Sequence, residues 1–290
     1  INKQKNSSIL KRLFVNLILK IKFLIDNFFA IPDDHWPWII SSYSLTNMIF
    51  EKYKPSFIIS SFPISSHLIA ARLKKMHPET KWIADFPDLW SQNHFYPYTK
   101  FRQNFDTYLE CNSLKDCDKI VTCMPGLAKT LKKIHSSKIE FIPHCTDLEL
   151  HKKKQKQIIK TDDYVIRYLG TLYPQQTTYL KLFMKSFEKF VEYLKIKNKN
   201  QINIRVEFIG TTSSLLENLI NENKYSSYFK IIPKVSFEES LNLMHSAKIL
   251  FLPLYIENNK LVNIFSSKLI EYIGSRNQCL IVGDHCEDFK

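Results

Sequence analysis

The sequence predicts an α/β protein built from two domains, each with a parallel sheet. Short apolar runs alternate with amphipathic segments along most of the chain, which is the pattern of strands joined by crossover helices. The runs are almost continuously apolar, as expected for strands covered on both faces. A polar, basic stretch at 150–162 interrupts the alternation, and 290 residues suffice for two domains of about 150 each.

The first predicted domain spans residues 1–150. A helical segment at 7–29 and another that reaches about Lys54 precede its first strand. The alternating part then contains strands at 56–61, 81–86, 119–123 and 139–144, and helices at 65–76, 101–115 and 125–134. Because helices of this length separate the strands, we expect a parallel sheet.

The second predicted domain spans residues 164–290, after a linker at 151–163 that has no periodic apolar face. Its predicted strands lie at 164–170, 205–210, 247–254 and 278–283. Between Tyr179 and Leu194, apolar residues recur at three- and four-residue spacing, which predicts a helix. Ser236-x-x-Glu239 is a capping box that predicts the start of a helix over 237–246.

The net charge is strongly positive. Lys and Arg number 41 against 28 Asp and Glu, which gives +13. This favours anionic partners such as nucleotide diphosphates, lipid phosphates or nucleic acid. A general abundance of Lys, Asn, Ile, Phe and Tyr also explains the charge, and we give that explanation the larger share. No basic stripe with interleaved aromatic residues is present, so we do not expect a nucleic-acid partner.

No motif indicates a metal or a cofactor. The six cysteines form no C-x-x-C pair, and no His, Asp and Glu cluster has metal-ligand spacing. The chain has five glycines and no Gly-rich phosphate loop. We therefore expect ligand binding to depend on strand ends and helix dipoles.

The cysteines are interpreted as thiols of a reducing compartment. There is no signal peptide and no apolar run of about 18 residues, so we expect a cytoplasmic protein. Residues 7–29 are amphipathic and basic. They can pack on their own domain, which we favour, or lie as a peripheral contact at the inner face of a membrane.

The stretch 263–272 is predicted to hold a phosphate group. It follows the apolar run at 247–254 and leads into a helix over 266–273. The first N–H groups of a helix have no internal partner, and the helix dipole favours an anion there. Ser266 and Ser267 offer hydroxyl donors, and Glu271, about one turn further, can accept from two ribose hydroxyls. The alternative is an ordinary amphipathic helix with a surface Glu.

The pattern small-small-Lys-Leu-x-Glu-Tyr, followed by a strand at 279–283, resembles the donor site of GT-B fold glycosyltransferases of retaining family 4. That family carries two Glu eight positions apart. Asn263 takes the place of the first, which in the family contacts the donor sugar, and Glu271 matches the second, which is implied to bind the nucleotide ribose. The resemblance also implies that Ser266 and Ser267 bind the diphosphate.

Three further elements of the second domain resemble the family. Gly170 and Thr171 follow the first strand, where related enzymes carry a Gly-x-Leu element and then a basic residue near the diphosphate. Gln175 and Gln176 stand there instead, so the positive charge must come from elsewhere, and we assign it to Lys268. Val235 falls in the segment that passes beside the base in the family.

The block Asp85-Phe86-Pro87-Asp88-Leu89-Trp90 lies at the C-terminal end of a predicted strand and resembles the acceptor side of the same family. Open α/β sheets bind ligands at this edge. Asp88 is our candidate catalytic residue, because a carboxylate there can orient an acceptor hydroxyl or accept its proton. The competing interpretation is structural: Asp85 caps a loop and Trp90 belongs to the core, which we favour for Trp90.

The resemblance covers roughly residues 30–290 and implies two Rossmann-like domains facing a cleft. By comparison with the family, we expect the first domain to be incomplete and the second to be incomplete at its C-terminus. It implies transfer of a sugar from a nucleotide-diphosphosugar to a glycan or lipid-linked acceptor, with retention of configuration and no metal, in cell-surface polysaccharide or glycolipid synthesis. The departures at Asn263, Gln175 and Gln176 leave open a non-catalytic, glycosyltransferase-like module that binds a nucleotide or a partner.

Overall fold

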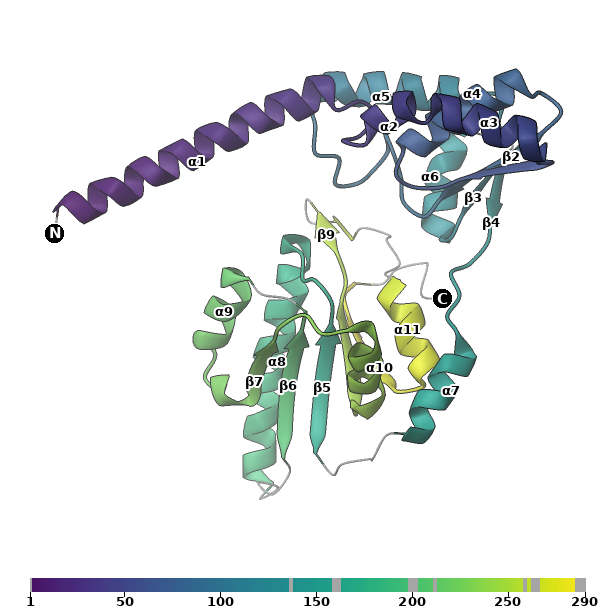
Figure 1. Ribbon diagram of the computed structural model, residues 1–290. Coiled ribbons are helices and arrows are strands. Elements are labelled where there is room, and N and C mark those ends of the chain that lie inside the picture. Colours follow the sequence, from purple (N-terminus) through teal and green to yellow (C-terminus); the bar gives the residue numbers. More distant parts are fainter. Residues whose placement is uncertain are drawn as a thin grey trace. The chain divides into compact units, whose positions relative to one another are not determined.

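The computed structural model describes residues 2–135, 138–157, 163–197, 203–210, 213–257, 260–261 and 267–284. The chain divides into two compact units, Ile1–Pro143 and His144–Lys290, each with its own parallel sheet (Figure 1). The predicted fold class, two Rossmann-like α/β domains, is confirmed. The boundary lies at Pro143, seven residues before the predicted end of the first domain at 150.

Unit 1 carries a four-stranded sheet in the order β1-β2-β3-β4, with all neighbours parallel. Its elements are α1 (Asn2–Phe29), α2 (Trp36–Ser41), α3 (Tyr43–Tyr53), β1 (Phe57–Ser60), α4 (Ser65–Met76), β2 (Lys81–Phe86), α5 (Lys100–Ser113), β3 (Lys119–Thr122), α6 (Pro125–His135) and β4 (Ile139–Phe141).

The central strand β2 shows why this sheet forms. Trp82, Ala84 and Phe86 alternate along it and are all fully buried. Strand β1 lies at the edge of the sheet, and its side chains Phe57 and Ile59 are exposed. The outer side of β1 is therefore open to pairing or covering by another segment.

Helix α1 does not pack on its own domain as we expected from residues 7–29. It extends away from the rest of unit 1 (Figure 1), and its large apolar side chains from Phe14 to Phe29 are exposed. Within its last turns only Asn27 is buried, where its side-chain carbonyl accepts from the Thr99 N–H at 3.1 Å and from the Thr99 hydroxyl at 3.0 Å. Among the α1 side chains that the structure describes, between Phe14 and Phe29, the favoured packing is wrong, because the only buried one is Asn27, near the C-terminal end.

Arg102 of α5 holds that end in place. Its Nη1 donates to the carbonyls of Asp26 and Asn27, and its Nη2 donates to those of Ala30 and Pro32, at 2.7 to 3.1 Å. These carbonyls belong to the end of α1 and the turn after it, where helix carbonyls lack internal partners. Its Nε pairs with Asp106 at 2.9 Å, and both side chains are buried.

Unit 2 carries a five-stranded sheet in the order β11-β8-β5-β6-β7, again with all neighbours parallel. Its elements are α7 (Leu148–Gln157), β5 (Tyr164–Leu169), η1 (Pro174–Gln176), α8 (Thr177–Ile196), β6 (Ile204–Ile209), α9 (Ser214–Asn221), η2 (Ser226–Tyr228), β7 (Phe229–Ile232), α10 (Phe237–Ser246), β8 (Ile249–Pro253), β9 (Ile256–Glu257), β10 (Lys260–Leu261), α11 (Ser267–Ser275) and β11 (Gln278–Val282).

The core of unit 2 lies between this sheet and α8. Phe183 of α8 stacks on Phe251 of β8, with 4.1 Å between ring centroids. On the predicted helical face, Tyr179, Phe187 and Val191 are buried as expected, whereas Leu182 and Phe190 are exposed. The N-cap of α10 is confirmed as well, because the Ser236 hydroxyl accepts from the Glu239 N–H at 3.2 Å.

The linker predicted at 151–163 is in part a helix. Residues up to Gln157 belong to α7, and residues 158–162 lie outside the described residues. Asp147 caps the helix by accepting from the N–H groups of Glu149 and Leu150. The sequence did not indicate this helix because most of α7 is polar; among its described side chains, at 148–155, only His151 is deeply buried.

Replacing Arg102 by Met should destabilise unit 1 by about 3–5 kcal/mol, because it leaves the buried Asp106 carboxylate without its cation. Urea unfolding followed by circular dichroism measures the loss. Lys119→Met is the matched control, since it breaks an exposed pair with Glu140 and should cost less than about 1 kcal/mol. Equal losses in the two variants would show that Arg102 does not hold α1.

Candidate functional site

Two glycines mark the carboxyl edge of the sheet in unit 2. Gly170 follows β5 and Gly210 follows β6, with φ of +116° and +87°. The Gly170 N–H donates to the Ile209 carbonyl at 2.8 Å, so the two strand ends stay paired up to this point. Side chains are disfavoured at such φ values, which leaves bare backbone at the edge where α/β sheets bind ligands.

Helix α11 is fixed against this edge by Tyr272. The Leu169 N–H of β5 donates to the Tyr272 hydroxyl at 2.9 Å, and the Tyr272 side chain is fully buried. Residues one turn apart share a helix face, so Lys268 lies on the same side of α11 as Tyr272. Helix α11 begins at Ser267, and the N–H groups of its first turn have no partner within the helix.

The side chain of Lys268 crosses directly over Gly170. A Cβ placed on Gly170 would lie 2.3 Å from Lys268 Cε, so only glycine leaves room for the lysine. Lys268 Nζ lies 3.5 Å from the Thr171 carbonyl and 5.5 Å from the Tyr168 ring centroid. The structure thus brings together three predicted donor residues: Gly170, Thr171 and Lys268.

Burial lowers the pKa of the Lys268 ammonium. The folded protein therefore holds the charged form at a cost, which is present at neutral pH and disappears only when the pH rises above the ordinary value for lysine. An anion placed beside Nζ would offset this cost. The Lys268 environment is accordingly suited to phosphate oxygens, which also match the N–H groups of the helix start.

Glu271 lies one residue before Tyr272, and its side chain is 36% exposed. Its Oε2 lies 3.1 Å from Nε2 of the buried His151. The Glu271 carboxylate is therefore at the surface of unit 2 and not part of its core. Sequence reasoning missed His151, because its 120-residue separation from Glu271 leaves no local signal.

The other predicted donor residues are placed less tightly. Ser267 is exposed at the start of α11, and Val235 is partly buried against the core in the loop before α10. Asn263 and Ser266 lie outside the described residues. Gln176, which stands where related enzymes carry a basic residue, is fully buried, and its amide nitrogen donates to the Pro253 carbonyl at 2.7 Å.

The predicted acceptor residues lie in unit 1: Asp85 belongs to β2, and Asp88 and Trp90 follow that strand. The Ser61 hydroxyl donates to Asp85 at 2.8 Å, which ties Asp85 to the end of β1. Asp88 is exposed and accepts from the Leu89 N–H at 2.8 Å. Partial desolvation raises the pKa of Asp88, and hydrogen bonds from Leu89 and Asn93 oppose the shift. A raised pKa makes a carboxylate a better proton acceptor near neutral pH.

Trp90 is buried, as favoured, and also lines a cavity of about 490 Å³ at the root of α1. Among the described residues its indole N–H has no hydrogen-bond partner. The cavity combines aromatic rings with carboxylates, contributed by Phe62, Trp90, Tyr96, Tyr98, Asp26, Asp33 and Asp34. Neither Asp85 nor Asp88 lines it.

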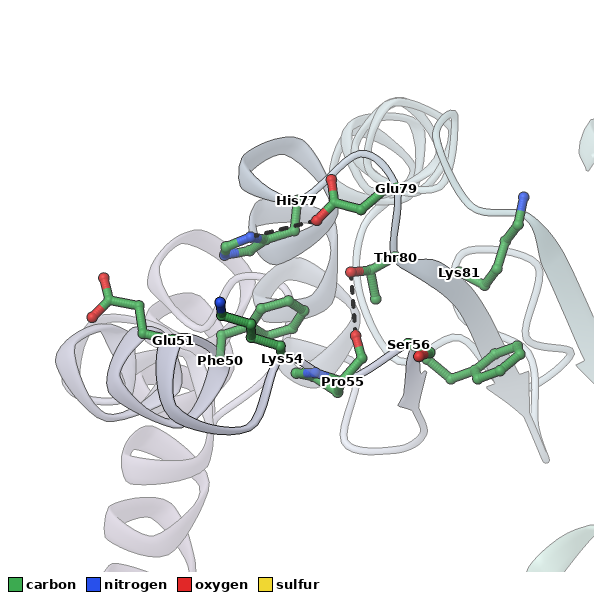
Figure 2. A pocket seen from close by; sticks show the side chains of 10 residues that line it. Phe50, Glu51, Lys54, Pro55, Ser56, His77, Glu79, Thr80 and Lys81 are labelled. Carbon is green, nitrogen blue, oxygen red and sulfur yellow. Dashed lines mark hydrogen bonds and ion pairs between the residues drawn. The ribbon is translucent and has the colours of Figure 1, made fainter.

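A second cavity of unit 1, of about 640 Å³, lies at the opposite edge of the sheet. Figure 2 shows its residues, which include Ser56 and Lys81 at the start of β1 and β2. Phe50 stacks on His77 along one wall, with 4.1 Å between ring centroids. Because ligands of α/β sheets bind at the carboxyl ends of strands, this amino-edge cavity is not a candidate for the predicted chemistry.

No protein-family model and no curated protein sequence matches the chain. Solved structures do match it. Sucrose-phosphate synthase from Thermosynechococcus elongatus aligns with a TM-score of 0.60 and 13% identity over 85% of this chain. A glycosyltransferase from Rickettsia africae ESF-5 aligns with 0.56 and 16% over 84%, and TarM aligns with 0.52 and 10% over 82%.

The chain therefore has the fold of GT-B glycosyltransferases, as the sequence resemblance implied. It spans 61% of the sucrose-phosphate synthase chain, 62% of the Rickettsia chain and 43% of the TarM chain. At these identities the likeness concerns the fold alone.

Replacing Gly170 by Ala should both strain the backbone and displace Lys268. The strain should destabilise unit 2 by about 1–3 kcal/mol, and the displaced ammonium should weaken binding of pyrophosphate. Gly210→Ala is the matched control, because its φ is also positive but its Cβ would meet its nearest atom at 3.7 Å. Thermal unfolding and calorimetric titration of both variants make the comparison. If Gly170→Ala and Gly210→Ala bound pyrophosphate with equal affinity, Lys268 would have no role in anion binding.

Proposed function

We propose that the chain is a glycosyltransferase, in which unit 2 binds a nucleoside-diphosphate sugar and unit 1 binds the acceptor. The observation that carries this proposal is the lysine over Gly170. Lys268, the start of α11 and the Glu271 carboxylate are arranged on one short helix at the carboxyl edge of the sheet. The Lys268 ammonium and the N–H groups at the start of α11 suit a diphosphate, and the Glu271 carboxylate suits a ribose diol.

In the proposed reaction, the bond from the anomeric carbon to the diphosphate oxygen breaks, and a bond from that carbon to the acceptor oxygen forms. Negative charge develops on the departing diphosphate. Lys268 and the N–H groups at the start of α11 would stabilise that charge electrostatically. Asp88 would orient the acceptor hydroxyl or accept its proton. Retention of configuration and a metal-independent step follow the family resemblance.

The cavity beside Trp90 supports a glycan or lipid-linked acceptor. Aromatic rings offer apolar faces to a sugar ring, while carboxylates accept hydrogen bonds from its hydroxyls. Tyr96 and Trp90 line this cavity together with Asp26 of α1. Such an acceptor fits a role in cell-surface polysaccharide or glycolipid synthesis.

Helix α1 supports peripheral contact with an anionic lipid surface. At about 100° per residue, Leu17, Ile21, Leu24 and Phe28 share one face, and Lys20 and Lys22 lie to either side of it. All six side chains are exposed. This is the arrangement of helices that lie in the plane of a membrane interface. None of the helices that the structure describes combines the length and apolar content needed to cross a bilayer.

Replacing Lys268 by Met tests the donor site. We expect unchanged or higher thermal stability without ligand, because a buried cation is removed, and about 10- to 100-fold weaker binding of UDP, GDP or ADP, whichever binds the wild type. Lys248→Met, at the amino edge of the same sheet, should leave that affinity unchanged. Thermal shift and calorimetry give both readouts.

Two other outcomes would decide between candidate functions. Destabilisation by Lys268→Met without loss of affinity would make Lys268 a structural residue. Nucleotide binding without transfer or hydrolysis of the corresponding sugar nucleotides would favour the non-catalytic module.

Substituting Ile21 and Leu24 of α1 together by Asp should reduce sedimentation with phosphatidylglycerol-containing vesicles at least tenfold, because each buried apolar side chain contributes about 1.5–3 kcal/mol. Binding by the wild type should weaken with salt and on pure phosphatidylcholine. Phe101→Asp, an exposed apolar residue of α5, is the control. A wild type that remains in the supernatant with both vesicle types would contradict the membrane contact.

A further inference from the structure

Three helices of unit 2 place two histidines behind Glu271. His151 comes from α7, His245 from the last turn of α10, and Glu271 from α11. His151 is 2% exposed, although α7 is otherwise mostly polar. A buried imidazole on such a helix indicates that its partners, and not hydrophobic packing, determine its position.

The three side chains form a continuous chain of contacts. His245 Nε2 lies 3.0 Å from His151 Nδ1, and His151 Nε2 lies 3.1 Å from Glu271 Oε2. The Thr146 hydroxyl lies 3.0 Å from the same Nε2. Both nitrogens of the His151 ring are therefore used.

For a neutral His151 ring, one set of proton positions satisfies these contacts. An ionised carboxylate only accepts, so His151 Nε2 carries the hydrogen that is donated to Glu271. In neutral His151 the other nitrogen, Nδ1, is then an acceptor, and it receives the hydrogen of His245 Nε2. Burial lowers the pKa of His245, which favours a neutral imidazole there.

The surrounding residues are arranged to hold this chain of contacts. The Asn277 side chain donates to the carbonyls of Met244 and His245, and Arg167 donates to the Leu243 carbonyl at 2.6 Å, which fixes the end of α10. Gly274 of α11 makes room for the imidazole, because a Cβ there would lie 2.7 Å from His151 Nε2.

We propose that His151 is a positioning residue for Glu271, and that His245 sets the tautomer in which His151 can do this. The role rests on the proposed function, in which Glu271 binds the ribose of a nucleoside diphosphate. His151 holds Oε2 and so fixes the rotation of the carboxylate, while 36% of the Glu271 side chain remains exposed to solvent. Without His151, the carboxylate of a half-exposed Glu would sample several rotamers, and ordering it would reduce ligand affinity.

The test is a set of variants titrated calorimetrically with UDP, GDP and ADP. His151→Phe keeps a ring but removes the donor, and should weaken the nucleotide that wild type binds by about tenfold. His151→Gln restores an N–H donor near the position of Nε2 and should return affinity to within about threefold of wild type. His245→Leu should give an intermediate loss, because the tautomer of His151 is then no longer fixed.

A double-mutant cycle separates positioning from a general structural role. In a Glu271→Ala background, His151→Phe should have no further effect on affinity, because the group that it positions is gone. Lys154→Ala is the matched control on α7: it breaks an exposed contact with Glu238 of α10 and should leave affinity unchanged. Equal losses from His151→Phe with and without Glu271 would overturn the proposal.

A measurement on the wild type covers the case in which His151→Phe fails to fold. In ¹⁵N-histidine NMR spectra at neutral pH, we expect the Nε2–H tautomer for both rings, and an Nδ1–H tautomer of His151 would overturn the proposal. If the wild type binds a nucleotide and His151→Phe binds it with the same affinity, the positioning role of His151 is wrong, while the proposed function stands. If the wild type binds none of the three nucleotides, the proposed function fails, and the role of His151 in ribose binding fails with it.

Discussion

The candidate donor site depends on one buried hydrogen bond, from the Leu169 N–H to the Tyr272 hydroxyl. It joins the last residue of β5 to the middle of α11 and so fixes both the distance and the rotation of that helix. Lys268 and Glu271 lie within one turn of Tyr272, so the hydrogen bond that fixes Tyr272 also fixes their positions. The hydroxyl accepts a main-chain donor that the sheet leaves unpaired, which is why a tyrosine and not a phenylalanine suits this position.

A comparable constraint acts on the loop after β2 in unit 1. The buried Glu110 of α5 accepts from the Ser91 N–H and hydroxyl with one oxygen and contacts His135 with the other. The loop that carries Asp88 and Trp90 is therefore attached at its far end to two helices. Both candidate sites thus sit on short segments whose main chain is tied to helices by buried polar groups, which keeps loop residues in defined positions.

Much of the fold could be predicted because strand and helix signals are local. The apolar alternation of β2 and the Ser236 cap of α10 each lie within a few residues, and both were located correctly. Lys268 and Glu271 entered the proposed site because they belong to a local sequence motif. His151 could not be found, because its partners are distant in sequence. The exposure of α1 was missed because an amphipathic pattern predicts which side of a helix is apolar, but it does not predict what that side packs against.

The attachment of α1 has a mechanical consequence. The helix is 28 residues long, so it extends about 42 Å from a root that Arg102 fixes through four carbonyls. A rod held at one end is a lever, and a bend of about 5° at the root would carry its tip through about 4 Å. A force on the N-terminal end of α1 would act first on the guanidinium of Arg102 in α5. This group lies beside the cavity that Tyr96 and Asp106 line.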